Sequence, residues 1–144
     1  MVDFNATIDR IVAKTQENML AVIKNSVQEL VQDAQTPRAK GGKMPVDTGF
    51  LRFSATAALN HVPSGETLGR DRLPGEEGVL PDYAIDDNAS YITDTLVKMK
   101  IGDVFHFGWT AVYANRQEIY NGFMESAVMN WQRIVDNQVR RLQK

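Results

Sequence analysis

The sequence has no cysteine, two histidines and no apolar run long enough to cross a bilayer. The missing thiols exclude disulfide bridges, thiolate metal sites and a cysteine nucleophile. A membrane-spanning helix needs about 20 consecutive apolar residues, and no such run occurs. No signal-peptide pattern opens the sequence, so we expect an intracellular protein.

An excess of charge of one sign is also missing, because 16 basic side chains are balanced by 18 acidic ones over 144 residues. Dedicated nucleic-acid-binding proteins usually carry a basic excess. The balance is uneven along the chain: residues 1–65 hold seven basic and six acidic side chains, residues 66–103 four and nine, and residues 104–144 five and three. The acidic middle is typical of solvated surface, or it attracts a basic end of another copy.

The periodicities that are present predict a single α+β domain over residues 1–144. We expect long N-terminal and C-terminal helices packed on a small antiparallel sheet, with a shorter middle helix and long exposed loops. The expected elements are a helix over 4–35, a basic loop over 36–49, a strand over 50–62, an exposed excursion over 63–86, a helix over 87–100, a strand over 103–109 and a helix over 121–143.

The first predicted helix is long for a chain of this size. It contains no internal glycine or proline, Asp3 or Asn5 is suited to cap its start, and Thr36-Pro37 ends it. About 30 residues at 1.5 Å per residue give a rod of roughly 45 Å. Its apolar stripe is longer than a small sheet covers, so we expect part of it to meet a neighbouring subunit.

A search for catalytic patterns gives no positive signal. His61 and His106 lack metal-ligand spacing, the serines lack a nucleophile-elbow context, and no phosphate-binding or Ca²⁺-binding loop is present. We therefore expect no catalytic, cofactor-binding or metal-binding residues and no enzyme activity. A hydrolase that uses His61 or His106 remains an alternative of a third class.

The basic loop offers a different kind of candidate. Arg38, Lys40 and Lys43 face either solvent or an acidic surface of a neighbour. A small nucleic-acid-binding module that combines these three cations with Arg140 and Arg141 is the alternative from another class. No aromatic residues interleave the loop, so sequence-specific recognition of bases is not expected.

Two segments resemble a known family. Residues 44–54, MPVDTGFLRFS, are similar to the P-V-D-T-G-x-L-R-x-S signature of the neck or minor tail components of long-tailed phages, also called tail-completion or head–tail joining proteins. Residues 100–107, KIGDVFHF, and residues 112–118, VYANRQE, resemble the G-D-x-hydrophobic strand and the Y-A-x-x-x-E segment of that family. The order of the elements also matches, over nearly the whole chain.

The resemblance implies a non-enzymatic virion protein that needs no cofactor. It would assemble as a homo-oligomeric ring at the head–tail junction and complete or join the tail to the head, after assembly in the host cytoplasm. Its partners would be further copies of itself, neighbouring connector and tail proteins, and passing DNA through non-specific contact, with no membrane. A tail terminator that caps the tail tube is the alternative within the same class.

The shared residues have expected structural roles. Asp47 and Thr48 are suited to set a turn, and Gly49 permits a positive φ before the next element. Arg52 and Glu118 would form an ion pair if their segments are adjacent. We therefore treat these five residues, with the three cations of the basic loop, as candidates for interface or structural roles.

Overall fold

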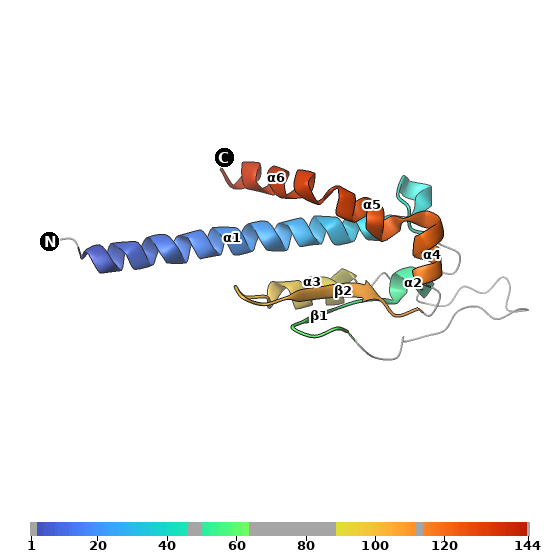
Figure 1. Cartoon of the computed structure of the whole chain (residues 1–144), viewed down its shortest axis with the longest axis horizontal. Coiled ribbons are helices and arrows are strands. Elements are labelled where there is room, and N and C mark those ends of the chain that lie inside the picture. Colours follow the sequence, from blue (N-terminus) through green and yellow to red (C-terminus); the bar gives the residue numbers. More distant parts are fainter. Residues whose placement is uncertain (1–2, 46–49, 64–88, 112–113, 144) are drawn as a thin grey trace, which may run out of the picture.

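The structure is a computed structural model that describes residues 3–45, 50–63, 89–111 and 114–143. It has the predicted α+β class, with a long first helix, a two-stranded antiparallel sheet and several further helices (Figure 1). The elements in order are α1 (Phe4–Gln35), the 3₁₀ turn η1 (Arg38–Lys40), α2 (Phe50–Phe53), β1 (Ala55–Leu59), α3 (Ala89–Val97), β2 (Phe105–Trp109), α4 (Ala114–Asn121), α5 (Phe123–Met129) and α6 (Trp131–Leu142).

The long helix α1 confirms the predicted bounds of 4–35. Its N-cap is Asp3, whose carboxylate accepts hydrogen bonds from the backbone N–H groups of Asn5 and Ala6 at 3.0 and 3.4 Å. It ends at Gln35, because Thr36 adopts an extended backbone ahead of Pro37. The expected start and stop signals therefore both act as predicted.

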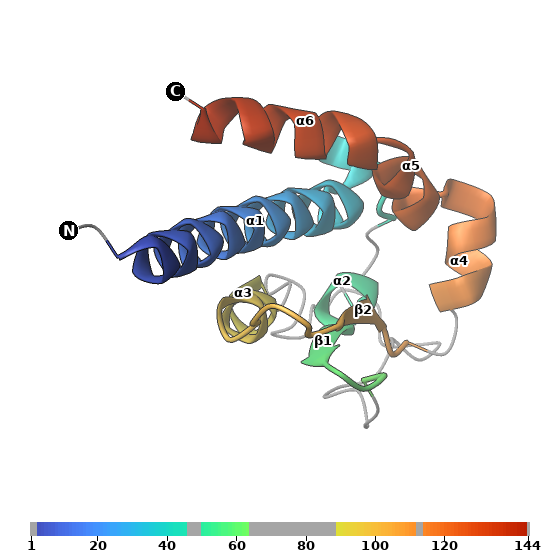
Figure 2. The ribbon, with the colours of Figure 1, turned by 60° about the vertical axis from the view of Figure 1, so that its left-hand side comes forward.

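Helix α1 lies between two layers (Figure 2). Helices α5 and α6 cover one side of it, and α3 with the two-stranded β1–β2 sheet lies on the other side. Helix α6 runs antiparallel to α1, so the two chain termini lie toward the same end of the molecule (Figure 1). The 3₁₀ turn η1 and helix α4 lie at the opposite end.

The sheet consists of β1 and β2, which pair antiparallel from Ala55 opposite Trp109 to Leu59 opposite Phe105. The predicted strand over 50–62 is wrong in its first part, because residues 50–53 form α2. Ser54 closes that helical turn: its N–H and its hydroxyl both donate to the carbonyl of Leu51, at 3.1 and 2.7 Å. Leu51 of this turn is buried in the core.

The single C-terminal helix predicted over 121–143 is also wrong, because α4, α5 and α6 replace it. Helix α4 begins at Ala114, well before the expected start. Gly122 interrupts the helical path with a φ of +64°, and Asn130 separates α5 from α6. Amphipathic spacing continues through both interruptions, which is why the sequence reads as one helix.

The other predicted elements are shorter than expected or lie outside the described residues. The middle helix predicted over 87–100 is observed as Ala89–Val97, followed by a turn in which Gly102 has a φ of +96°. The strand predicted over 103–109 begins at Phe105. The structure does not describe residues 64–88, so the predicted excursion over 63–86 lies outside the described residues except for residue 63.

The core contains two clusters of buried side chains joined by an aromatic contact. One consists of Met44, Leu51, Ala111, Ala114 and Phe123, and the other of Val31, Ala55, Ala57 and Ile92. Trp109 packs against both and meets Phe107 and Phe123 edge-to-face, with ring centroids 4.8 Å apart in each pair. Trp109 therefore connects the sheet to the α4–α5 end of the molecule.

Candidate interface and structural sites

The basic loop is a closed turn. The N–H of Arg38 donates to the carbonyl of Met44, and the N–H of Met44 donates to that of Thr36, at 3.0 and 3.1 Å. Met44 is fully buried in the core, whereas Arg38, Lys40 and Lys43 are exposed. The turn thus presents three cations from a backbone that is anchored to the core, as an interface candidate requires.

Two glycines make this turn possible. Gly41 has a φ of +88°, which side chains rarely tolerate. At Gly42 an added Cβ would lie 2.0 Å from the carbonyl oxygen of Thr36, so no larger residue fits there without moving the backbone. The pair therefore sets the position of the three cations.

The five cations of the nucleic-acid alternative do not form one surface. Arg38, Lys40 and Lys43 lie on or beside η1, whereas Arg140 and Arg141 lie in the last turn of α6. Figure 1 shows η1 and the end of α6 on opposite sides of the α5–α6 junction, separated by the length of α6. A continuous basic path for a nucleic-acid backbone does not link them in the described part of the chain.

The PVDTG-like segment is described only in part. Asp47, Thr48 and Gly49 lie outside the described residues. Arg52, on α2, donates from Nε to the carbonyl of Gln35 at 3.0 Å, and the Gln35 side chain donates to the carbonyl of Arg52 at 2.9 Å. The Gln35 side-chain oxygen also accepts from the indole N–H of Trp109 at 2.8 Å. Gln35 therefore joins the end of α1 to α2 and β2.

Arg52 and Glu118, both among the described residues, do not form the expected ion pair with each other. Glu118 lies on α4, and its carboxylate accepts hydrogen bonds from the backbone N–H groups of Met124 and Glu125, at 2.9 and 2.8 Å. These donors belong to the first turn of α5, which has no partner for them within its own helix. Glu118 thus caps α5 across the break at Gly122, and the pairing hypothesis is wrong.

The GD-like segment forms a hydrogen-bonded clasp with Asn60 at the end of the sheet where β1 ends and β2 begins. One carboxylate oxygen of Asp103 accepts from the Asn60 side chain at 3.0 Å, and the other accepts from the backbone N–H of Lys100 at 2.8 Å. Asn60, at a φ of +67°, in turn accepts from the N–H of Val104. These hydrogen bonds, that from Asn60 first, lower the pKa of Asp103 below its ordinary value.

Sequence reasoning missed Gln35 and Asn60. Gln35 is a buried polar residue at the end of an apolar helix face, next to Val31 and Ala34 at helical spacing. Asn60 ends a strand, where asparagine tolerates a positive φ. Both signals are visible in the sequence but are too common to single out one residue.

The two histidines are not brought together with further ligands. The Nδ1 atom of His61 lies 2.9 Å from the carbonyl oxygen of Leu59, and His106 lies opposite Ala58 in the β1–β2 sheet. No group of three or more His, Asp or Glu side chains within the described ranges is arranged to hold a metal ion. No described helix is both long enough and apolar enough to cross a membrane.

Large apolar side chains are exposed on several elements of the described chain, and the first half of α1 and helix α4 are two of these places. On the first half of α1, Phe4 and Ile11 are 74% and 61% exposed. On α4, Ile119 and Tyr120 are 75% and 69% exposed. Figure 1 places these segments at opposite ends of the molecule. A contiguous exposed apolar patch marks a protein-interaction site, and the first half of α1 carries such a series of side chains.

Comparison with known proteins gives no relative: no family model, curated protein or solved structure matches the chain.

Proposed function

We propose that the chain is a structural virion protein of a tailed phage, which assembles as a ring at the head–tail junction and completes or joins the tail to the head. The observation that carries the proposal is that large apolar side chains are exposed at distant places on one folded chain, including α1 and α4 at its opposite ends. A ring subunit contacts a neighbour on each of two sides, and such contacts are made by different patches. The PVDTG-like and GD-like segments resemble the neck family, and this resemblance is the reason to expect the assembly at the head–tail junction.

The basic turn fits this role as a contact for anionic surfaces. Arg38, Lys40 and Lys43 are held on an anchored turn at the α4 end of the molecule. The same turn suits either an acidic surface of a neighbouring subunit or the phosphates of passing DNA. Reversal of all three charges should leave the fold intact, because all three side chains are exposed, while weakening whichever contact the turn makes.

The test is deletion of the gene from the phage genome that encodes it, followed by electron microscopy of the particles. Intact full heads beside separate finished tails support the joining role. Tails of uncontrolled length would instead support the tail-terminator alternative, and normal virions would overturn both. The protein with Ala13→Ser, an exposed and conservative change on α1, is the complementation control and should restore normal particles.

A further inference from the structure

Helix α1 continues far beyond the end of α6, which it accompanies for only part of its length (Figure 1). The last residue of α6, Leu142, lines the same groove as Met19 and Val22 of α1. The segment of α1 before these residues therefore projects from the rest of the fold. Phe4, Ile8 and Ile11 are exposed within it.

These exposed residues continue the side of α1 that α6 covers. Phe4, Ile8, Ile11 and Thr15, here called the apolar strip, follow at spacings of four, three and four residues, and thus share one helix face. The series continues through Met19, Val22, Ser26 and Glu29 at the same spacings. Ser26 is fully buried, and the Glu29 carboxylate accepts from the Gln138 side chain of α6 at 3.1 Å.

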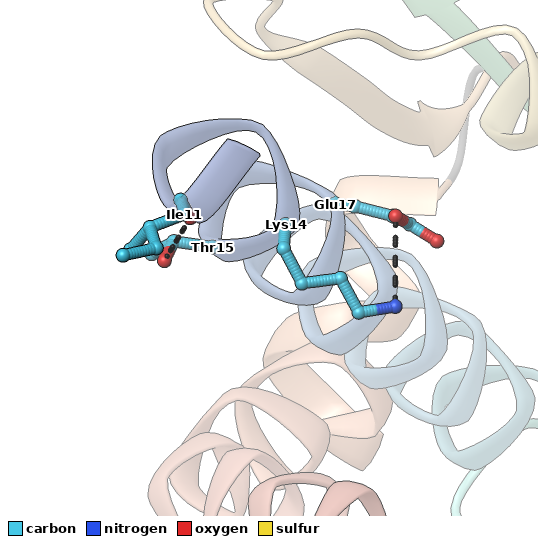
Figure 3. A network of polar contacts seen from close by, with 4 residues as sticks. All are labelled: Ile11, Lys14, Thr15 and Glu17. Carbon is cyan, nitrogen blue, oxygen red and sulfur yellow. Dashed lines mark hydrogen bonds and ion pairs between the residues drawn. The ribbon is translucent and has the colours of Figure 1, made fainter. Parts of the chain in front are cut away.

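The one polar member of the apolar strip has its hydrogen bond satisfied inside the helix. The Thr15 hydroxyl donates to the carbonyl of Ile11 at 2.8 Å (Figure 3). The exposed Lys14–Glu17 ion pair, at 3.7 Å, lies on another side of the helix. The apolar strip can therefore be buried without leaving a polar group unpaired.

An apolar groove begins where the strip ends. It has a volume of about 380 Å³ and is lined mainly by Met19, Val22 and Ile23 of α1 with Val139 and Leu142 of α6. Phe4 of the same chain cannot fill it, because 15 residues of straight helix place Phe4 about 22 Å from Met19 along the axis. The start of α1 is therefore not the occupant of the groove within one copy of the chain.

We propose that a second copy of the chain fills this groove, with the two apolar strips packed antiparallel about a two-fold axis. With Phe4 of the second copy placed opposite Met19, Ile8 meets Thr15 and Ile11 meets Val12 in the same register. The second α1 then runs in the direction of α6 and begins where α6 ends. It thereby extends an existing helix–helix contact along the same face of α1.

The charges at this junction are complementary. Helix α6 ends with Arg140 and Arg141 in its last turn, and α1 begins with the carboxylate of Asp3. In the antiparallel register the start of one α1 lies beside the end of the other copy's α6, so opposite charges meet. The inference concerns the free chain and does not rest on the proposed virion role.

The absence of cysteine makes the register directly testable. We expect an equimolar mixture of the I8C and T15C proteins to give a disulfide-linked dimer on mild oxidation, several-fold more than either protein alone. Positions 8 and 8 of two copies lie about 10 Å apart along the axis in this register, too far for a disulfide. The matched control is a mixture of A6C and A13C, which has the same spacing on the opposite face of α1.

A second measurement does not depend on cross-linking. The unsubstituted chain should have twice the mass of one copy by light scattering at tens of micromolar, and the I8E/I11E variant the mass of one copy. Both substitutions lie on the projecting segment, so the unfolding transition should match that of the parent at concentrations low enough for the parent to be a single copy. Equal cross-linking of the control mixture, a single-copy mass for the unsubstituted chain, or ladders beyond dimers from an I8C/T15C chain would each overturn the antiparallel pair.

Discussion

Gln35 and Arg52 exchange hydrogen bonds across the junction of α1 and α2. The Gln35 side-chain amide donates to the Arg52 carbonyl at 2.9 Å, and the Arg52 Nε donates to the Gln35 carbonyl at 3.0 Å. The remaining side-chain oxygen of Gln35 accepts from Trp109 at 2.8 Å. The side-chain amide of Gln35, at the end of α1, therefore satisfies groups from two other elements, α2 and β2, that are far apart in the sequence.

Gln35→Ala should destabilise the protein because it removes the partners of the Arg52 carbonyl and the Trp109 indole at the same time. Each unsatisfied buried polar group costs about 1–3 kcal/mol, so we expect a loss of about 2–4 kcal/mol in the free energy of unfolding. Urea unfolding followed by tryptophan fluorescence measures it. Gln32→Ala, an exposed position three residues earlier on the same helix, is the control and should change stability by less than about 0.5 kcal/mol.

The sequence predicts those parts of the fold that depend on local pattern. The bounds of α1 follow from Asp3, from its apolar spacing and from Pro37, which all act within a few residues. The division of the C-terminal segment at Gly122 does not follow, because amphipathic spacing continues across the break. What stabilises that break is the Glu118 carboxylate, and its two partners become evident only when α5 folds back toward α4.

The same distinction applies to the candidate site residues. Arg38, Lys40 and Lys43 are exposed as the composition of the loop indicates. The partners of Arg52 and Glu118 could not be predicted, because a sequence gives the charge of a side chain but not which backbone groups it will meet. Both residues satisfy backbone hydrogen-bonding groups in the structure, where charge matching had suggested an ion pair.

Glu118→Ala should cost about 1–2 kcal/mol of stability, because it removes the acceptor for two N–H groups at the start of α5. Glu118→Gln retains one acceptor oxygen and should fall between the two proteins. Thermal unfolding by circular dichroism gives the order. Glu125→Ala, an exposed carboxylate on α5 itself, is the matched control; an equal loss in that variant would contradict a specific cap.

Reversal of both charges should not rescue a single reversal at Arg52 or Glu118. The two side chains have separate partners, Gln35 for the first and the α5 backbone for the second. The effects of R52E and E118R on the free energy of unfolding should therefore add within about 0.5 kcal/mol. A double-mutant cycle measures this, and a double variant more stable than either single variant would restore the ion-pair hypothesis.

Asp103 should make the stability of its clasp with Asn60 depend on pH in the acid range. Its pKa is lowered in the folded protein from an ordinary value of 3.8, mainly by the Asn60 hydrogen bond. A group whose pKa is depressed on folding stabilises the protein above the unfolded pKa, and this contribution is lost as pH falls through the folded value. The stability difference between the parent and Asp103→Asn should shrink as pH falls through 3.8 toward the lower pKa of the folded protein. Asp94→Asn removes an exposed carboxylate from α3 and serves as the control; an equal change in that variant would argue against the clasp.

The antiparallel pair and the proposed ring make a joint prediction, because they need different symmetry. A ring between a head and a tail has two unlike faces, so its subunits are related by rotation about the ring axis and not by a two-fold axis between neighbours. The pair must therefore separate before subunits enter such a ring.

An I8C/T15C dimer locked by its disulfides should fail to restore head–tail joining when added to extracts of particles that lack the protein. The same sample after reduction should restore joining, and the A6C/A13C protein should be active before and after reduction. Joining by the locked dimer would mean that the two-fold contact persists in the assembled virion.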